Sequence, residues 1–264
     1  LFVTIITRDD VTTSPKECLP TTTIPSHPII ASVHTMRNSL LVHLNNAAID
    51  YLNGGNINEA QNILCRAFNA SIRHSHQRHN LEASNQDMSL EYVLQDCLQP
   101  LHRRVRGCEN SVSSELYRFL SLNFIRIETS HLNEESVDLF CSCALSWAIG
   151  YNLSVVYSLV GLLRGIKTGG ESFLKRASRI LMPIRRQILL QHSTSTFWLS
   201  VKLCVLNNSI CILREIGSND LTLVLRTMEE LLDKSRAHLR PVDVKNFYLS
   251  IQFMNVGTSY AAAA

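Results

Sequence analysis

Two runs of apolar residues at helical spacing, separated by a pair of glycines, constrain the fold of this chain most strongly. Between residues 31 and 53 apolar positions recur every three or four residues, which predicts a helix. Gly54 and Gly55 follow, and a glycine can adopt the left-handed conformation that ends a helix. A second amphipathic pattern then begins, with Asn56 or Asn58 as its cap. This part of the chain therefore predicts an antiparallel helical hairpin.

The hairpin resembles a tetratricopeptide (TPR) repeat over about residues 41–72. If Leu41 is the first of about 34 positions, eight residues match the signature of the family and Ile72 replaces the usual proline. The matching residues are Leu44, Ala47, Ala48, Tyr51, Gly55, Ala60, Leu64 and Ala67. The alanines let two helices approach closely, and we expect Leu44, Tyr51 and Leu64 to fill the gaps between them. A single pair cannot bury both of its faces, so the resemblance implies further pairs.

Residues 196–239 repeat this pattern in a weaker form. Leu206 is followed by two asparagines, as Leu44 is. Gly217 then follows at the same distance as Gly55 follows in the first pair. We therefore expect a second helix pair here.

Two more segments complete the expected stack of helices. Residues 155–166 and 172–190 predict a third pair, joined by a loop that contains glycine. Residues 241–256 begin with proline, which suits a first helical turn, and carry their apolar side chains on one face. We expect this last segment to be a helix that caps the final pair.

The expected fold is therefore all-α, with antiparallel helix pairs stacked as a TPR-like α-solenoid and closed by a C-terminal capping helix. Only 10 glycines and 7 prolines occur in 264 residues, which agrees with long helices and few turns. Residues 31–256 would form this domain, between a disordered leader at 1–30 and a tail at 257–264. Residues 75–133 are expected to be an irregular insertion or a degenerate repeat, with an extended segment at 120–124.

Charge and cysteine content exclude several classes of protein. Charged residues make up 18% of the chain and the formal net charge is +3, so we expect neither a disordered chain nor a nucleic-acid-binding protein. None of the eight cysteines forms a Cys-x-x-Cys pair, which favours reduced thiols and an intracellular, cytoplasmic location.

An uncharged stretch of 25 residues at 139–163 predicts an alternative architecture. It is long enough to cross a bilayer, so a single-pass membrane protein anchored by residues 139–163 is the alternative to a scaffold. The stretch also contains several serines and an asparagine. A break at Gly150, Tyr151 and Asn152 would divide it into two buried helices, and this is the interpretation that we favour.

No catalytic pattern is found in the sequence. Gly-x-Ser-x-Gly, His-Glu-x-x-His and phosphate-binding glycine loops are absent, so we expect neither an enzyme nor a cofactor. His74, His76 and His79 would spread around a helix rather than converge, so we expect no metal site.

The TPR resemblance implies a peptide-binding groove on the concave surface formed by the first helix of each pair. The corresponding positions are Val42, Asn45, Ile49, Leu52 and Asn53 in the first pair, and Cys204, Asn207, Asn208, Cys211 and Arg214 in the last. Asparagine amides both donate and accept hydrogen bonds, which suits a peptide backbone, although they could equally satisfy neighbouring helices. The expected function is a non-enzymatic scaffold that binds a peptide or helix of an unknown protein partner.

Overall fold

The structure, a computed structural model, describes residues 28–78, 98–100, 119–127, 142–190 and 195–261. Within these ranges it contains seven α-helices and one antiparallel pair of three-residue strands. The expectation of a helical protein is therefore confirmed for the described part of the chain.

The helices and strands follow one another along the chain with these bounds. The α-helices are α1 (Pro28–Asn53), α2 (Ile57–Arg78), α5 (Ser142–Arg164), α6 (Gly170–Leu190), α7 (Thr196–Glu215), α8 (Leu221–Ser235) and α9 (Pro241–Ala261). The strands are β1 (Leu98–Pro100) and β2 (Asn123–Ile125), and two single-turn 3-10 helices are η3 (Ile166–Thr168) and η4 (Arg236–His238).

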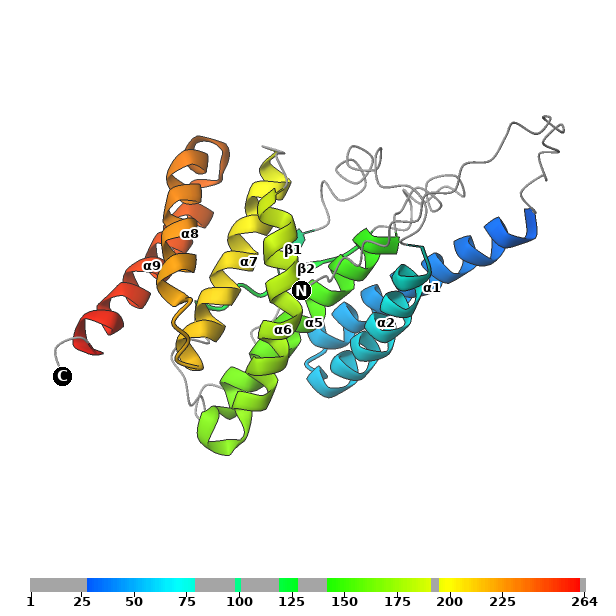
Figure 1. The fold of residues 1–264 in the computed structure, drawn as a ribbon, viewed down its shortest axis with the longest axis horizontal. Helices are drawn as coiled ribbons and strands as arrows, with labels where there is room; N and C mark the ends of the chain where they lie inside the picture. Colours follow the sequence, from blue (N-terminus) through cyan, green and yellow to red (C-terminus); the bar gives the residue numbers. More distant parts are fainter. Residues whose placement is uncertain (1–27, 79–97, 101–118, 128–141, 191–194, 262–264) are drawn as a thin grey trace, which may run out of the picture.

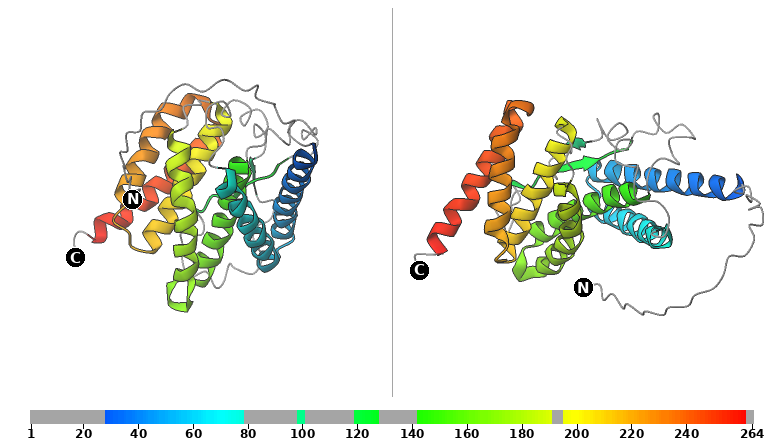
Figure 2. Two further views of the ribbon diagram at one scale, coloured as in Figure 1. Left: turned by 45° about the vertical axis from the view of Figure 1, so that its right-hand side comes forward. Right: turned by 45° about the horizontal axis from the view of Figure 1, so that its top comes forward.

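Neighbouring helices in the sequence are also neighbours in space. The helix α1 packs on α2, α2 on α5, α5 on α6, and so on to α9. Figure 1 shows this order along the long axis of the molecule, from α1 (blue) to α9 (red), and both views in Figure 2 keep it. In addition, α5 contacts both α1 and α7. The helices α1, α5 and α7 therefore form one row, and residues on them can act together.

The first hairpin forms where the sequence predicts it. Gly55 has a φ of +84°, and the side chain of Asn56 accepts a hydrogen bond from the Glu59 amide at 3.2 Å, so Asn56 caps α2. The prediction for Tyr51 is wrong, because this side chain is 44% exposed. Ile49 and Leu52 are buried at this end of α1 instead.

The expected break at Gly150 is also wrong, because α5 continues from Ser142 to Arg164. Gly150 is a site of close packing: a Cβ atom there would lie 2.8 Å from the ring of Phe68 on α2. At Gly161 a Cβ atom would lie 2.6 Å from Leu174 on α6. These glycines stay in the helix because they let neighbouring helices approach.

Replacing Gly161 with alanine is expected to lower the free energy of unfolding by about 1–3 kcal/mol. Helix propensity alone would favour alanine by about 1 kcal/mol. A loss of stability would therefore show that close packing at Gly161 outweighs the gain in helix propensity. Urea unfolding followed by circular dichroism measures it. In a Leu174→Ala background the cost of Gly161→Ala should fall but not vanish, because the Gly170 carbonyl oxygen would still lie 3.0 Å from the added Cβ. An unchanged cost there would contradict the packing argument.

The boundaries of the helical part differ from the expected ones. The helix α1 begins at Pro28, inside the expected leader, because proline is well tolerated in a first helical turn. Residues 1–27 lie outside the described part of the chain. At the other end, α9 begins at Pro241 as predicted and continues to Ala261, five residues past the expected limit at 256. Its inward positions, Val244, Phe247, Ile251 and Met254, are buried.

Two helices in the described ranges are long and apolar enough to cross a membrane, Leu145–Arg164 and Thr196–Glu215. Inside the protein 94% and 89% of their most apolar windows are buried. In this structure other segments cover the surface that a lipid-facing helix would expose. Core helices of soluble proteins meet the same criteria of length and hydropathy, so a membrane anchor at 139–163 stays an alternative prediction.

Candidate functional site

A row of buried asparagines crosses the three adjacent helices α1, α5 and α7. It consists of Asn45 and Asn46 on α1, Asn152 on α5, and Asn207 and Asn208 on α7. All are buried except Asn46, which is half-buried. A buried amide costs free energy unless it forms hydrogen bonds, so this asparagine row needs a polar partner.

That partner is the backbone of residues 119–127, which we call the held segment. At one end, the Ser121 amide donates to Oδ1 of Asn208 at 2.8 Å, and Nδ2 of Asn208 donates to the Ser121 carbonyl at 3.1 Å. Asn207 donates to the Phe119 carbonyl at 2.6 Å. The two asparagines of α7 therefore bind main-chain atoms of two residues in the held segment.

Asn152 binds the middle of the held segment, within β2. The Ile125 amide donates to Oδ1 of Asn152 at 2.8 Å, and Nδ2 of Asn152 donates to the Ile125 carbonyl at 2.9 Å. The same Nδ2 also donates to Oδ1 of Asn45 at 2.8 Å, which joins α5 to α1. One side chain thus uses its whole amide to hold a strand and to connect two helices.

The asparagines of α1 bind the far end. The Ile127 amide donates to Oδ1 of Asn46 at 3.1 Å, and Nδ2 of Asn46 donates to the Ile127 carbonyl at 2.5 Å. Asn45 donates to the Ile125 carbonyl at 2.9 Å. Ser121, Ile125 and Ile127 are therefore each held at both N–H and C=O by one amide, as a neighbouring β-strand would hold them. The held segment runs from α7 to α1, opposite to the order of the helices.

Side chains of the held segment add apolar anchors and one ion pair. Phe124, Ile125 and Ile127 are fully buried. Phe119 stacks on Phe253 of α9 with ring centroids 4.3 Å apart. Arg126 reaches Asp50 of α1 at 2.5 Å on the exposed side. The strand β1 lies beside β2 and pairs with it in antiparallel register.

The sequence-predicted site residues divide into three groups. Asn45, Asn207 and Asn208 bind the held segment, and Cys204 accepts a hydrogen bond from its Asn123 at 3.3 Å. Four others, Val42, Ile49, Leu52 and Cys211, are buried core residues. The remaining two are Asn53, the half-buried last residue of α1, and Arg214.

Arg214 binds α9 rather than the held segment. Its guanidinium donates to the Phe253 carbonyl at 2.8 Å and lies 4.8 Å from the centroid of the Phe253 ring. Because Phe253 also stacks on Phe119, Arg214 supports one end of the held segment through an intermediate residue.

Sequence reasoning missed Asn152 as a site residue and did not place Asn46 in the groove. The available signal for Asn152 was its position, because an asparagine in the middle of an apolar run at 139–163 needs a buried hydrogen-bond partner. The signal for Asn46 was its adjacency to Asn45, which matches the pair Asn207 and Asn208. Neither pattern showed which segment of the chain these asparagines bind.

The two buried thiols near this site are poor nucleophiles. Burial raises the pKa of Cys204 to about 11 and that of Cys211 to about 12, so both stay protonated at neutral pH. We expect iodoacetamide at pH 8 to leave both unmodified in the folded protein and to modify both in urea, as read by peptide mass spectrometry. Complete labelling of either cysteine in the folded protein within minutes would contradict this burial.

Histidines and other metal-binding groups form no centre in the described residues. No group of three His, Cys, Asp or Glu side chains lies close enough there to hold a metal ion. His74 and His76 belong to α2, and His79 lies outside the described ranges.

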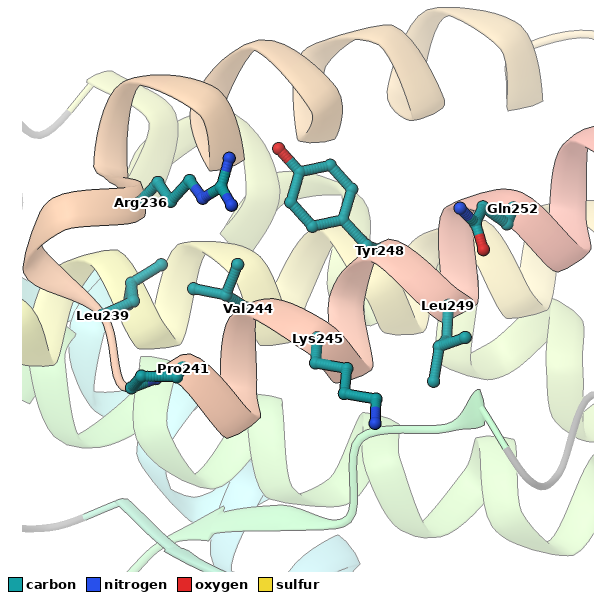
Figure 3. Close-up of a pocket in the computed structure, with 8 residues that line it drawn as sticks. All are labelled: Arg236, Leu239, Pro241, Val244, Lys245, Tyr248, Leu249 and Gln252. Carbon is teal, nitrogen blue, oxygen red and sulfur yellow. The ribbon is translucent and has the colours of Figure 1, made fainter.

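A separate cavity of about 480 Å³ opens beside α9, next to η4 (Figure 3). Its walls are largely apolar and include Leu239, Val244 and Leu249. In Figure 3 the polar ends of Arg236 and Tyr248 lie on one side of the cavity and that of Lys245 on the opposite side, so the polar groups do not all meet at one point. A small-molecule site needs polar groups that converge on the ligand, so this cavity does not suggest one.

The asparagine row is the arrangement of described residues from which we infer a function. It is defined by hydrogen bonds to the backbone of the held segment rather than by a catalytic or metal-binding group. No protein-family model, curated protein or solved structure matches this chain.

Proposed function

We propose that this protein is a non-enzymatic scaffold for protein–protein contacts, built as a TPR-like stack of helix pairs whose concave groove holds an extended polypeptide. The observation that carries the proposal is the asparagine row, in which Asn46, Asn152 and Asn208 each bind both the N–H and the C=O of one residue. Main-chain hydrogen bonds of this kind recognise an extended peptide with little dependence on its sequence.

The chemistry favours an extended ligand over a helical one. In an α-helix nearly every backbone N–H and C=O is already hydrogen-bonded within the helix. An amide such as that of Asn152 could not bind both groups of one residue in it. The proposal is therefore restricted to an extended peptide, whereas the sequence predicted either a peptide or a helix.

The held segment occupies the proposed groove from within the same chain. A covalently linked segment competes with an effective concentration of about millimolar, so a partner peptide binds well only when the held segment is loosened. Ser121 and Arg126 are suitable positions for loosening it, because both are incompletely buried and neither belongs to a helix of the groove. The Ser121→Pro substitution removes the N–H that donates to Oδ1 of Asn208, and Arg126→Glu removes the ion pair with Asp50.

A labelled peptide that copies residues 119–127 tests the proposal by fluorescence anisotropy. We expect weak binding to the unmodified protein and binding at least about tenfold tighter to the Ser121→Pro, Arg126→Glu double variant, since a lost buried hydrogen bond is worth about 1–3 kcal/mol. The matched control peptide carries N-methyl groups at the positions of Ser121, Ile125 and Ile127. Equal binding of both peptides, or no binding to a double variant that keeps its helical circular dichroism, would overturn the proposal.

The alternative, a membrane protein anchored by 139–163, has its own test. Part of this stretch lies in one of the two helices that meet the length and hydropathy criteria for a span. Retention of the protein in carbonate-washed membranes would support the anchor. Release into the supernatant would reject it.

A further inference from the structure

The outward face of α6 concentrates positive charge. Residues 164–190 contain seven Lys or Arg and one Asp or Glu, so this stretch carries +6 while the whole chain carries +3. One exposed surface of α6, which we call the basic face, consists of the side chains of Lys175, Arg176, Arg179, Arg186, Met182, Leu189 and Leu190. The rest of the chain is net negative, so the charge is segregated rather than spread over the surface.

The orientation of the basic face follows from the packing of α6. Leu174, Ala177, Leu181, Ile184 and Ile188 recur every three or four residues and are buried. Since α6 packs on α5 and α7, this stripe faces those helices, and Lys175, Arg179 and Arg186 lie on the opposite, exposed side. Arg176 is also exposed, but its side chain reaches the hydroxyl of Tyr157 on α5. The single acidic residue of the helix, Glu171, pairs with Lys175 at 2.7 Å, and the other ion pairs among the described residues lie outside α6.

Apolar side chains lie exposed in the middle of the same face and at its C-terminal end. Leu190 is 74% exposed, and Met182 and Leu189 are each 38% exposed. Just before α6, Ile166 of η3 is 41% exposed beside the exposed Lys167. Clusters of Lys and Arg on a helix attract anionic lipid headgroups, and exposed aliphatic side chains beside them can enter the boundary with the acyl chains.

We propose that the basic face binds the surface of a membrane containing anionic lipids, as a peripheral contact. The arginines would pair with lipid headgroups, and Leu189, Leu190 and Met182 would enter the boundary with the acyl chains. The length of α6, roughly 30 Å for 21 residues, spreads the cations along a line, which suits a flat field of charge better than a compact acidic peptide. The asparagines that bind the held segment lie on α1, α5 and α7, so this contact is independent of the groove.

Vesicle co-sedimentation of the full chain tests this inference. We expect at least tenfold more binding to vesicles with about 30% phosphatidylserine than to pure phosphatidylcholine, decreasing as salt rises because exposed charges are screened. The variant Lys175→Glu, Arg179→Glu, Arg186→Glu should lose this binding. The matched control Arg226→Glu, Lys234→Glu, Lys245→Glu makes the same change of charge at exposed sites on α8 and α9, and should keep it.

The apolar part of the face has a separate readout. The double variant Leu189→Asn, Leu190→Asn should bind the anionic vesicles as well as the unmodified protein does at low salt. At high salt a smaller fraction of this variant should remain bound. No binding to the anionic vesicles, or equal loss in the two charge-reversal variants, would overturn the proposal. So would binding of the basic face to poly-glutamate together with none to vesicles, because that result indicates an acidic protein partner.

Discussion

Replacing Asn152 with alanine should lower the free energy of unfolding by about 3–5 kcal/mol. The change removes three hydrogen bonds in a fully buried place and leaves the Ile125 amide and Oδ1 of Asn45 without their partner. An unsatisfied buried polar group costs about 1–3 kcal/mol, and the cavity adds to this. Urea unfolding followed by circular dichroism measures the loss.

Two further variants separate hydrogen bonding from volume in this prediction. Asn152→Leu fills the space but forms no hydrogen bonds, so it should remain strongly destabilising. Asn62→Ala removes an exposed asparagine from α2 and should change stability by less than about 0.5 kcal/mol. If Asn152→Ala were as mild as Asn62→Ala, the asparagine row would not hold the strand.

Replacing Phe124 with alanine should destabilise the protein by about 3–5 kcal/mol, the usual cost of truncating a buried phenylalanine. Phe124 is 0% exposed and lies in β2, next to Ile125, which Asn152 binds. Leu122→Ala is the matched control, since Leu122 is only half-buried in the same segment and should cost less. The same urea unfolding experiment measures both.

The two large effects should not add. Both substitutions loosen the held segment, so the second costs less once the first has been made. We expect a coupling of about 0.5–3 kcal/mol in a double-mutant cycle of Asn152→Ala and Phe124→Ala. Strict additivity would mean that Phe124 and Asn152 stabilise separate parts of the protein.

Local pattern was enough to predict most of the helices. The first hairpin, its turn at Gly55 and the start of α9 at Pro241 depend on helical periodicity, capping and glycine conformation, all of which act over a few residues. The same local reasoning was wrong at Gly150. A glycine between apolar runs looks like a break, and only the approach of Phe68 from α2 explains why it lies inside a helix.

The candidate site was predictable only in part. The repeated pair of asparagines after Leu44 and Leu206 indicated amides suited to a backbone, and Asn45, Asn207 and Asn208 do bind one. That this backbone belongs to residues 119–127 could not be read from spacing. Asn45 and Ile125 are 80 residues apart, and no local pattern joins them.

The sequence by itself determined the helical character of this protein, because periodicity and the scarcity of glycine and proline act within each segment. The tertiary structure decided which segment of the chain the buried asparagines hold and in which direction it runs. The physical reason is that a buried amide must be paired, but any backbone that reaches it can satisfy that need. Only the packing of α1, α5 and α7 in one row brings the amides to the same strand.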